Sequence, residues 1–125
     1  MTVTEVATVS LKDFFDEILE NAAENAKVGA ISRYDWGSET NSIYFENNYF
    51  MVEGSYSASG YFHKTGDGYW EPRETYITGA RASVDELTVH QFNPETEDYD
   101  IEVEDSIVNE LSAYLEKRLP NYLND

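Results

Sequence analysis

The chain has no cysteine and no long apolar run, and each absence removes a class of protein. Without cysteine there is no disulfide, no thiolate metal site and no cysteine nucleophile. No segment approaches the ~18 apolar residues of a membrane-spanning helix, and the N-terminus lacks a basic stretch followed by an apolar one. We therefore expect a cytoplasmic protein with no membrane partner.

Cations are also scarce. Eight Lys and Arg stand against 25 Asp and Glu, which gives a formal net charge of −17, and no Lys or Arg occurs between Ala82 and Glu116. Surfaces that bind nucleic acid or anionic lipid need clustered cations to displace counterions. The composition therefore argues against nucleic acid and anionic membranes as partners but names no partner. We expect the partner to be another protein.

What the chain does contain is enough for one folded domain over residues 1–125. It is 41% hydrophobic, and its aromatic residues comprise ten Tyr, six Phe and two Trp. Acidic disordered proteins are poor in aromatics, and aromatic side chains pack well in β-sheets. These features predict a folded protein with much β-structure.

Residues 10–26 carry apolar residues at intervals of three and four, which predicts an amphipathic helix with Ser10 as its N-cap. The opposite face of this helix is entirely acidic, and it comprises Asp13, Asp16, Glu17, Glu20 and Glu24.

The pattern then changes to alternation, which predicts strands at residues 28–34, 42–45, 49–63, 75–82, 87–92 and 99–103. Gly54 and Gly60 interrupt the longest of them and indicate a bulge or bend. A C-terminal amphipathic helix is expected to begin at Asp105 or Ser106 and to end near Pro120. Short connections favour antiparallel pairing. The predicted fold is α+β, an antiparallel sheet of about four to six strands with both helices on one face.

Seven acids lie within the eleven residues from Glu95 to Asp105. A calcium loop is suggested by Asn93, Glu95, Glu97, Asp98 and Asp100, but the sequence lacks the glycine at position six and the glutamate at position twelve of an EF-hand. If Tyr99, Ile101 and Val103 point inward, the outer side of a strand carries Asp98, Asp100, Glu102 and Glu104. We interpret these four residues as a solvated face or a partner-binding surface, and we predict no metal site.

His63 and His90 are the only histidines, and no nucleophile elbow, zinc-binding helix or phosphate-binding loop occurs. We therefore predict no catalytic residues and no cofactor, and expect the protein not to be an enzyme. A small hydrolase or a metal-dependent enzyme that uses the acidic cluster is the alternative from another class.

Aromatic residues concentrate between Tyr49 and Tyr76. Alternation cannot place all of them in one core, and exposed Tyr and Trp are enriched at protein interfaces. The segment Trp70-Glu71-Pro72-Arg73, beside a glycine-rich connection, is therefore a candidate recognition loop, and Tyr69 and Trp70 are its candidate partner-binding residues. The alternative is that this segment folds back on the sheet. An aromatic surface of this kind could also serve self-association, so a homo-oligomeric accessory protein is a further alternative.

An acidic surface can also imitate DNA. B-DNA carries one phosphate per ~3.4 Å of axis on each strand, whereas carboxylates on one side of a β-strand recur every ~6.7 Å. One acidic strand is therefore too sparse, and a mimic would need a second row, which the acidic face of the first helix would supply if it lay beside the strand.

The segment 52–73, the hairpin within 89–103 and the closing acidic helix resemble the small acidic uncharacterised proteins encoded by bacteriophages and mobile elements. The resemblance implies a bacterial or phage origin and binding to a host protein, including inhibition of restriction or CRISPR nucleases. It implies no catalytic residues.

Overall fold

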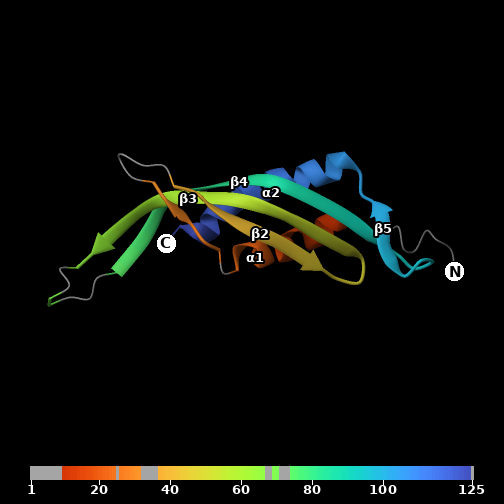
Figure 1. Ribbon diagram of the computed structural model, residues 1–125, viewed down its shortest axis with the longest axis horizontal. Coiled ribbons are helices and arrows are strands. Elements are labelled where there is room, and N and C mark those ends of the chain that lie inside the picture. The colour runs from red at the N-terminus through yellow and green to blue at the C-terminus, as the bar shows by residue number, and fades with distance from the viewer. Residues whose placement is uncertain (1–9, 25, 32–36, 67–68, 71–73, 125) are drawn as a thin grey trace.

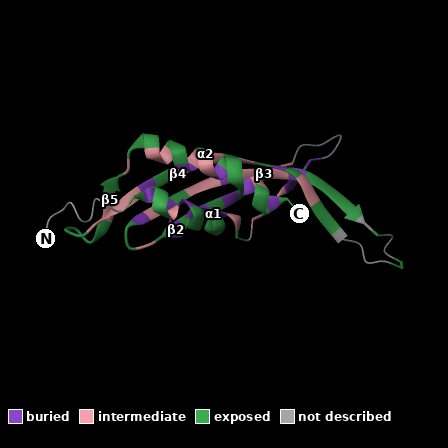
Figure 2. Ribbon diagram, turned by 180° about the vertical axis from the view of Figure 1, so that it is seen from behind, coloured by how far each residue is buried: buried purple, intermediate pink, exposed green. Residues whose placement is uncertain are grey.

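The computed structural model describes residues 10–24, 26–31, 37–66, 69–70 and 74–124. In this part of the chain, helices cover one face of a five-stranded sheet and the other face is open (Figures 1 and 2). The elements in chain order are η2 (Leu11–Phe14), α1 (Phe15–Ala23), β1 (Gly29–Ala30), β2 (Glu39–Glu46), β3 (Phe50–Thr65), β4 (Glu74–Asn93), β5 (Asp98–Glu102) and α2 (Asp105–Leu123). The predicted α+β fold with a helix at each end is confirmed.

The sheet is built around the long antiparallel hairpin of β3 and β4. β5 pairs with β4 at one edge, while β2 and β1 share the opposite edge of β3. β1 runs parallel to β3, so the sheet is mixed, although the prediction had it antiparallel. β1 is also shorter than the strand predicted at 28–34, and residues 32–34 of that strand lie outside the described part.

β4 is one continuous strand where the sequence predicted two, at 75–82 and 87–92. The polar residues between them do not form a turn, because a register shift after Ser55 inserts Asp85 as an extra residue opposite β3. The close approach of the two strands here needs a glycine. A Cβ on Gly54 would lie 2.2 Å from the backbone oxygen of Glu86, so the bulge predicted from Gly54 is present.

A second register shift, between Ser59 and Tyr61, marks a bend in the hairpin. Across from it, Gly79 has a φ of +60°, a conformation that side chains disfavour. Beyond this bend the hairpin continues as a two-stranded ribbon that leaves the helix-covered body, at the left of Figure 1.

The core lies between the helices and the inner face of the sheet. Leu111, Leu115 and Leu119 of α2 and Ile18 of α1 are completely buried. Tyr56 of β3 is also completely buried, and its hydroxyl donates a 2.6 Å hydrogen bond to the carbonyl oxygen of Ala22 in α1. This bond ties the first helix to the central strand.

The helix ends differ in part from the prediction. Ser10 caps the first helical segment as expected, and Asp13 completes a capping box. α1 ends at Ala23 rather than at residue 26, so Glu24 lies after the helix. α2 begins after Glu104, which makes no side-chain cap, and the expected caps Asp105 and Ser106 lie within it.

α2 also continues past Pro120 to Leu123, although proline was expected to end it. Proline removes one backbone donor from a helix, but Leu119 before it and Leu123 after it are both buried in the core. This packing holds the last turn, and the N–H of Asn124 still donates to the Pro120 carbonyl.

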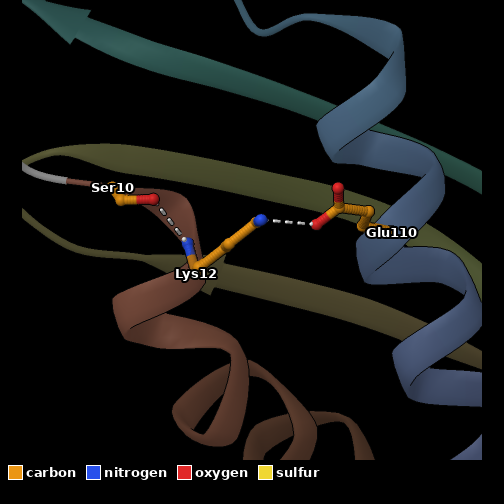
Figure 3. A network of polar contacts seen from close by, with 3 residues as sticks. All are labelled: Ser10, Lys12 and Glu110. Carbon is orange, nitrogen blue, oxygen red and sulfur yellow. Dashed lines mark hydrogen bonds and ion pairs between the residues drawn. The ribbon is translucent and has the colours of Figure 1, made fainter.

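Three further contacts hold α2 and the residue that follows it, Asn124, against their neighbours. The backbone N–H groups of Val84 and Ala80 in β4 donate to Oε1 of Glu116 and Oδ1 of Asn124, at 3.0 and 2.9 Å. At the other end of the helix pair, the ammonium of Lys12 in η2 lies 2.9 Å from a carboxylate oxygen of Glu110 (Figure 3).

Candidate functional site

The ribbon beyond the bend is the most exposed apolar part of the described chain. We call residues 61–78 the arm; its described residues are 61–66, 69–70 and 74–78. Its exposed large side chains are Tyr61 (40% exposed), Phe62 (43%), Tyr69 (80%), Trp70 (82%) and Tyr76 (37%). The arm therefore exposes five large aromatic side chains within one short ribbon.

The register of the arm places apolar groups on both of its faces. His63 pairs with Tyr76, and their rings stack with centroids 4.9 Å apart. The ring Nε2 of His63 also lies 2.7 Å from the hydroxyl of Thr78 on the same face. Phe62 pairs with Ile77, and alternation puts this pair on the opposite face. Each face of the arm therefore carries exposed aromatic rings next to polar side chains.

The arm also differs from the body in charge. Its sequence holds two cations, Lys64 and Arg73, and three acids, Asp67, Glu71 and Glu74, so it accounts for only one unit of the net charge of −17. The remaining negative charge belongs to the rest of the chain. The arm is thus nearly neutral and aromatic, on a strongly acidic body.

Tyr69 and Trp70, the predicted recognition residues, lie at the tip of the arm. Their rings meet edge to face with centroids 4.7 Å apart. Residues 71–73, which the sequence grouped with Trp70, lie outside the described residues. The exposure of both rings fits the prediction that some aromatics of this region leave the core.

The open face of the sheet is the second candidate surface, and sequence reasoning did not single it out. We call the side of β2–β5 away from the helices the open face. Its acidic residues are Glu46 of β2, Glu53 of β3, Asp85 and Glu86 of β4 and Glu102 of β5. The bulge places Asp85 there beside Glu86, since the Ser57 hydroxyl donates to its carboxylate at 2.7 Å.

Three of these acids form a diagonal line across three strands. Glu53 pairs with Tyr44 of β2 and Thr88 of β4, and its diagonal neighbours are Glu46 and Glu86. Diagonal neighbours on one face of a sheet lie about 7–8 Å apart. Among the described residues the one ion pair, Lys12–Glu110, is on the helix side, so no described cation pairs with this line.

Tyrosines border one end of the open face. The Tyr44 hydroxyl donates to Glu46, and the Tyr99 hydroxyl donates to the carbonyl of Asn47. The Glu46 carboxylate, through this hydrogen bond, raises the pKa of Tyr44 above its usual range. Burial, followed by the Glu46 charge, raises the pKa of Tyr99. Both phenols therefore stay neutral hydrogen-bond donors at physiological pH.

The structure places the four predicted acids of the last strand at the surface, but not as the regular row that was expected. Asp98, Asp100, Glu102 and Glu104 are all exposed. However, β5 ends at Glu102 and a register shift interrupts its pairing with β4. Ile101 pairs with Gln91 and so lies on the helix side as expected, but it is 38% exposed. The shift breaks the simple alternation on which the prediction depended.

The acidic face of the first helix does not supply the second row. Asp13, Asp16, Glu17, Glu20 and Glu24 are exposed, as expected. However, α1 packs against β2 and α2, whereas β5 pairs with β4 at the opposite edge of the sheet. The structure therefore does not bring α1 and β5 side by side as a double row of carboxylates.

No group of three or more potential metal ligands is present among the described residues. Two open hollows of about 290 Å³ lie in the described part, one between α1 and α2 and one where β5 meets η2. Binding pockets for small molecules usually measure about 300–1,000 Å³. His63 lies on the arm, and His90 pairs with Met51 and Glu102 within the body sheet, so the two histidines form no dyad.

Comparison with protein-family models, curated proteins and solved structures found no match to this chain. Within the described residues, no helix combines the length and the apolar character needed to cross a membrane.

Proposed function

We propose that this protein is a non-enzymatic protein-binding module and that the arm is its principal contact element. The observation that carries the proposal is the projection of a nearly neutral, aromatic ribbon from an acidic, well-packed body. Interfaces concentrate their binding energy in a few aromatic and arginine side chains that become fully buried in the complex.

The energetics favour this use of the arm. Burying one large apolar side chain stabilises a complex by about 1.5–3 kcal/mol. Trp70 and Tyr69 at the tip are 82% and 80% exposed, so both have most of this gain still to make. Tyr and Trp also have few rotatable bonds, so little side-chain entropy is lost when they dock.

The open face favours a second candidate function, the binding of a cationic protein surface in place of DNA. The diagonal of Glu46, Glu53 and Glu86 provides carboxylates on three adjacent strands, which one acidic strand could not. With the resemblance to phage-encoded acidic proteins, the candidate partner is a DNA-binding host enzyme, such as a restriction or CRISPR nuclease. Binding of this kind weakens steeply with salt, whereas aromatic contacts tolerate salt.

The test is affinity capture from bacterial lysate at low and high salt, with two pairs of matched variants. Trp70→Ala is compared with Tyr122→Ala, which removes a 52% exposed aromatic ring from α2. The triple change of Glu46, Glu53 and Glu86 to Gln is compared with the same change at the exposed α1-side residues Glu17, Glu20 and Glu24. Each control removes the same type of group from the helix side.

A partner retained at high salt by the wild type and by Tyr122→Ala, but lost with Trp70→Ala, is the expected result. A partner held only at low salt and lost only with the open-face triple variant would instead establish the second candidate. Equal capture by all variants would refute both.

A further inference from the structure

We propose that the outer edge of β2 binds an extended, lysine- or arginine-rich segment of a partner protein, which adds to the sheet as an antiparallel strand. The site lies on the body and involves no residue of the arm, so it goes beyond the proposed role of the arm. It would hold the partner by its backbone as well as by its charge.

β2 is an edge strand with a regular pattern of backbone groups. It pairs with β3 on one side, and no described segment pairs with its other side. The N–H of Asn47 donates to the Phe50 carbonyl at 3.0 Å, which makes these two residues a hydrogen-bonded pair. Bonded and non-bonded pairs alternate along an antiparallel ladder. The residues whose N–H and C=O groups point away from β3 are therefore Thr40, Ser42, Tyr44 and Glu46.

The edge of β2 has none of the usual protections. Native proteins block open edges with lysine, proline, bulges or inward-pointing charges. The strand Glu39–Glu46 contains no lysine or proline, its register with β3 is unbroken, and its buried residues Asn41, Ile43 and Phe45 are uncharged. On the other side of the sheet, side chains of the C-terminal segment occupy two backbone donors of β4. β2 therefore keeps the form in which a sheet accepts an added strand.

The side chains along this edge determine the chemistry of the partner. Thr40, Ser42, Tyr44 and Glu46 are exposed on the open face. An antiparallel strand that bonds to them places its own bonded residues directly beside them on the same face. Glu46 and its diagonal neighbour Glu53 would attract a cationic side chain there. The Tyr44 ring is 52% exposed and can bind the same cation over its π face.

No described cation of this chain neutralises that end of the edge. Within the described residues, Glu46 makes no ion pair. Lys27 is held against β2, because its N–H donates to Oδ1 of Asn41 at 2.7 Å and its carbonyl accepts from Nδ2 at 2.8 Å. Asn41 is buried near the start of the strand, so this contact lies on the helix side and away from Glu46. The cationic residues of the partner are therefore expected at the Glu46 end.

A second copy of this chain fits the edge less well than a basic segment does. Pairing of two β2 edges would place two bodies side by side, and each chain has a net charge of −17. Bodies of like charge repel one another at close range. A short basic strand instead gains from the same charge, so we assign the edge to a cationic partner.

The probe is a peptide of alternating lysine and valine with blocked ends, equal in length to β2, and its affinity for the full chain is measured by calorimetry. Two derivatives carry N-methyl groups on the backbone of every lysine or of every valine. If the lysines lie on the open face, their N–H groups point to β2 and those of the valines point to solvent. The two derivatives have the same charge and length, so they control for one another.

Three variants test the protein side of the contact. Ser42→Pro removes one outward N–H, and proline is tolerated on an edge strand where the N–H faces solvent; urea denaturation checks that this variant folds. Glu46→Gln and Glu86→Gln each remove one charge from the open face. Glu86 lies on β4, two strands away from β2, and is the matched control.

We expect methylation of the lysines to weaken binding about tenfold or more, because each methyl group removes a backbone hydrogen bond. Methylation of the valines should change the affinity less than about twofold, since their N–H groups face solvent. Ser42→Pro should weaken binding of the unmodified peptide about fivefold or more. Glu46→Gln should weaken it more than Glu86→Gln does.

Equal affinities of the two methylated peptides would mean that charge alone attracts the peptide, and they would overturn the inference. The reverse order, no binding even at low salt, or unchanged binding by a folded Ser42→Pro would overturn it as well. Dimerisation of the chain alone, measured by sedimentation equilibrium and lost in Ser42→Pro, would show that a second copy takes the edge instead.

These outcomes are separable from those of the proposed function. Trp70→Ala leaves β2 unchanged and should bind the peptide as the wild type does. If a partner is captured through Trp70 while the peptide does not bind, the edge site is refuted and the role of the arm stands. If the peptide binds as expected but Trp70→Ala captures the same proteins as the wild type, the arm is refuted and the edge site stands.

Discussion

Replacing Tyr56 with Phe removes one buried hydroxyl and leaves the ring. The ring is completely buried, and its hydroxyl donates at 2.6 Å to the carbonyl of Ala22, a residue that is only 3% exposed. A buried neutral hydrogen bond contributes about 1 kcal/mol net, and the cost is greater when an unsatisfied acceptor remains. We therefore expect Tyr56→Phe to lower the free energy of unfolding by about 1–2 kcal/mol.

The assay is urea denaturation followed by circular dichroism, with Tyr122→Phe as the control. Tyr122 is 52% exposed, so loss of its hydroxyl should change stability by less than about 0.5 kcal/mol. A loss for Tyr56→Phe as small as that of the control would refute the argument that this bond ties α1 to the sheet.

The stability of the wild type and that of Tyr56→Phe should also depend differently on pH. Burial raises the pKa of Tyr56 above its ordinary value of 10.0. The unfolded chain then loses this proton at a lower pH than the folded chain does. The stabilisation is fully present below pH 10.0 and declines as pH rises from there towards the folded-state pKa. The stability difference between wild type and Tyr56→Phe should therefore shrink above that pH, and parallel curves would contradict this assignment.

Three further changes test the fold and the surface, each by urea denaturation. Gly54→Ala should cost more than about 2 kcal/mol, because its Cβ would lie 2.2 Å from the Glu86 backbone oxygen; a neutral effect would show that the bulge can open freely. Lys12→Ala should lower the free energy of unfolding by at most about 1 kcal/mol, since both members of its ion pair with Glu110 are more than half exposed. A larger loss would contradict the view that this ion pair is a weak surface contact. The last variant neutralises the exposed acids near β5 by the changes Asp98→Asn, Asp100→Asn, Glu102→Gln and Glu104→Gln. At low salt its free energy of unfolding should be unchanged or slightly higher, because repulsion between carboxylates is relieved. A marked loss of stability would show that these acids have a structural role.

The periodic parts of the fold follow from the sequence. Apolar residues at helical spacing locate α1 and α2, and alternation locates most strand residues, because each element must bury one face. What alternation cannot show is a register shift. Ser83, Asp85 and Glu86 have the composition of a turn, and only the pairing of Ser83 and Glu86 with β3, with Asp85 as the bulge residue, makes them part of one strand. The register shift between Gln91 and Asn93 likewise interrupts the regular alternation that was expected for residues 98–102.

The candidate surfaces were predictable to different degrees. Tyr69 and Trp70 were recognised because they sit beside a glycine-rich connection. The open face was not, since Glu46, Glu53 and Glu86 are far apart in the chain and become neighbours only through cross-strand pairing. In each strand the sequence shows a carboxylate on the polar side. It does not show which carboxylates of different strands become neighbours, because that depends on the register of pairing.

The contacts of α2 with β4 have a consequence for how this protein avoids uncontrolled polymerisation. The Glu116 and Asn124 side chains accept hydrogen bonds from the Val84 and Ala80 N–H groups, which a strand from another molecule would otherwise use. The C-terminal helix therefore covers this part of the sheet edge and occupies its backbone donors. Pairing of this edge with a strand of another molecule is therefore blocked at Val84 and Ala80.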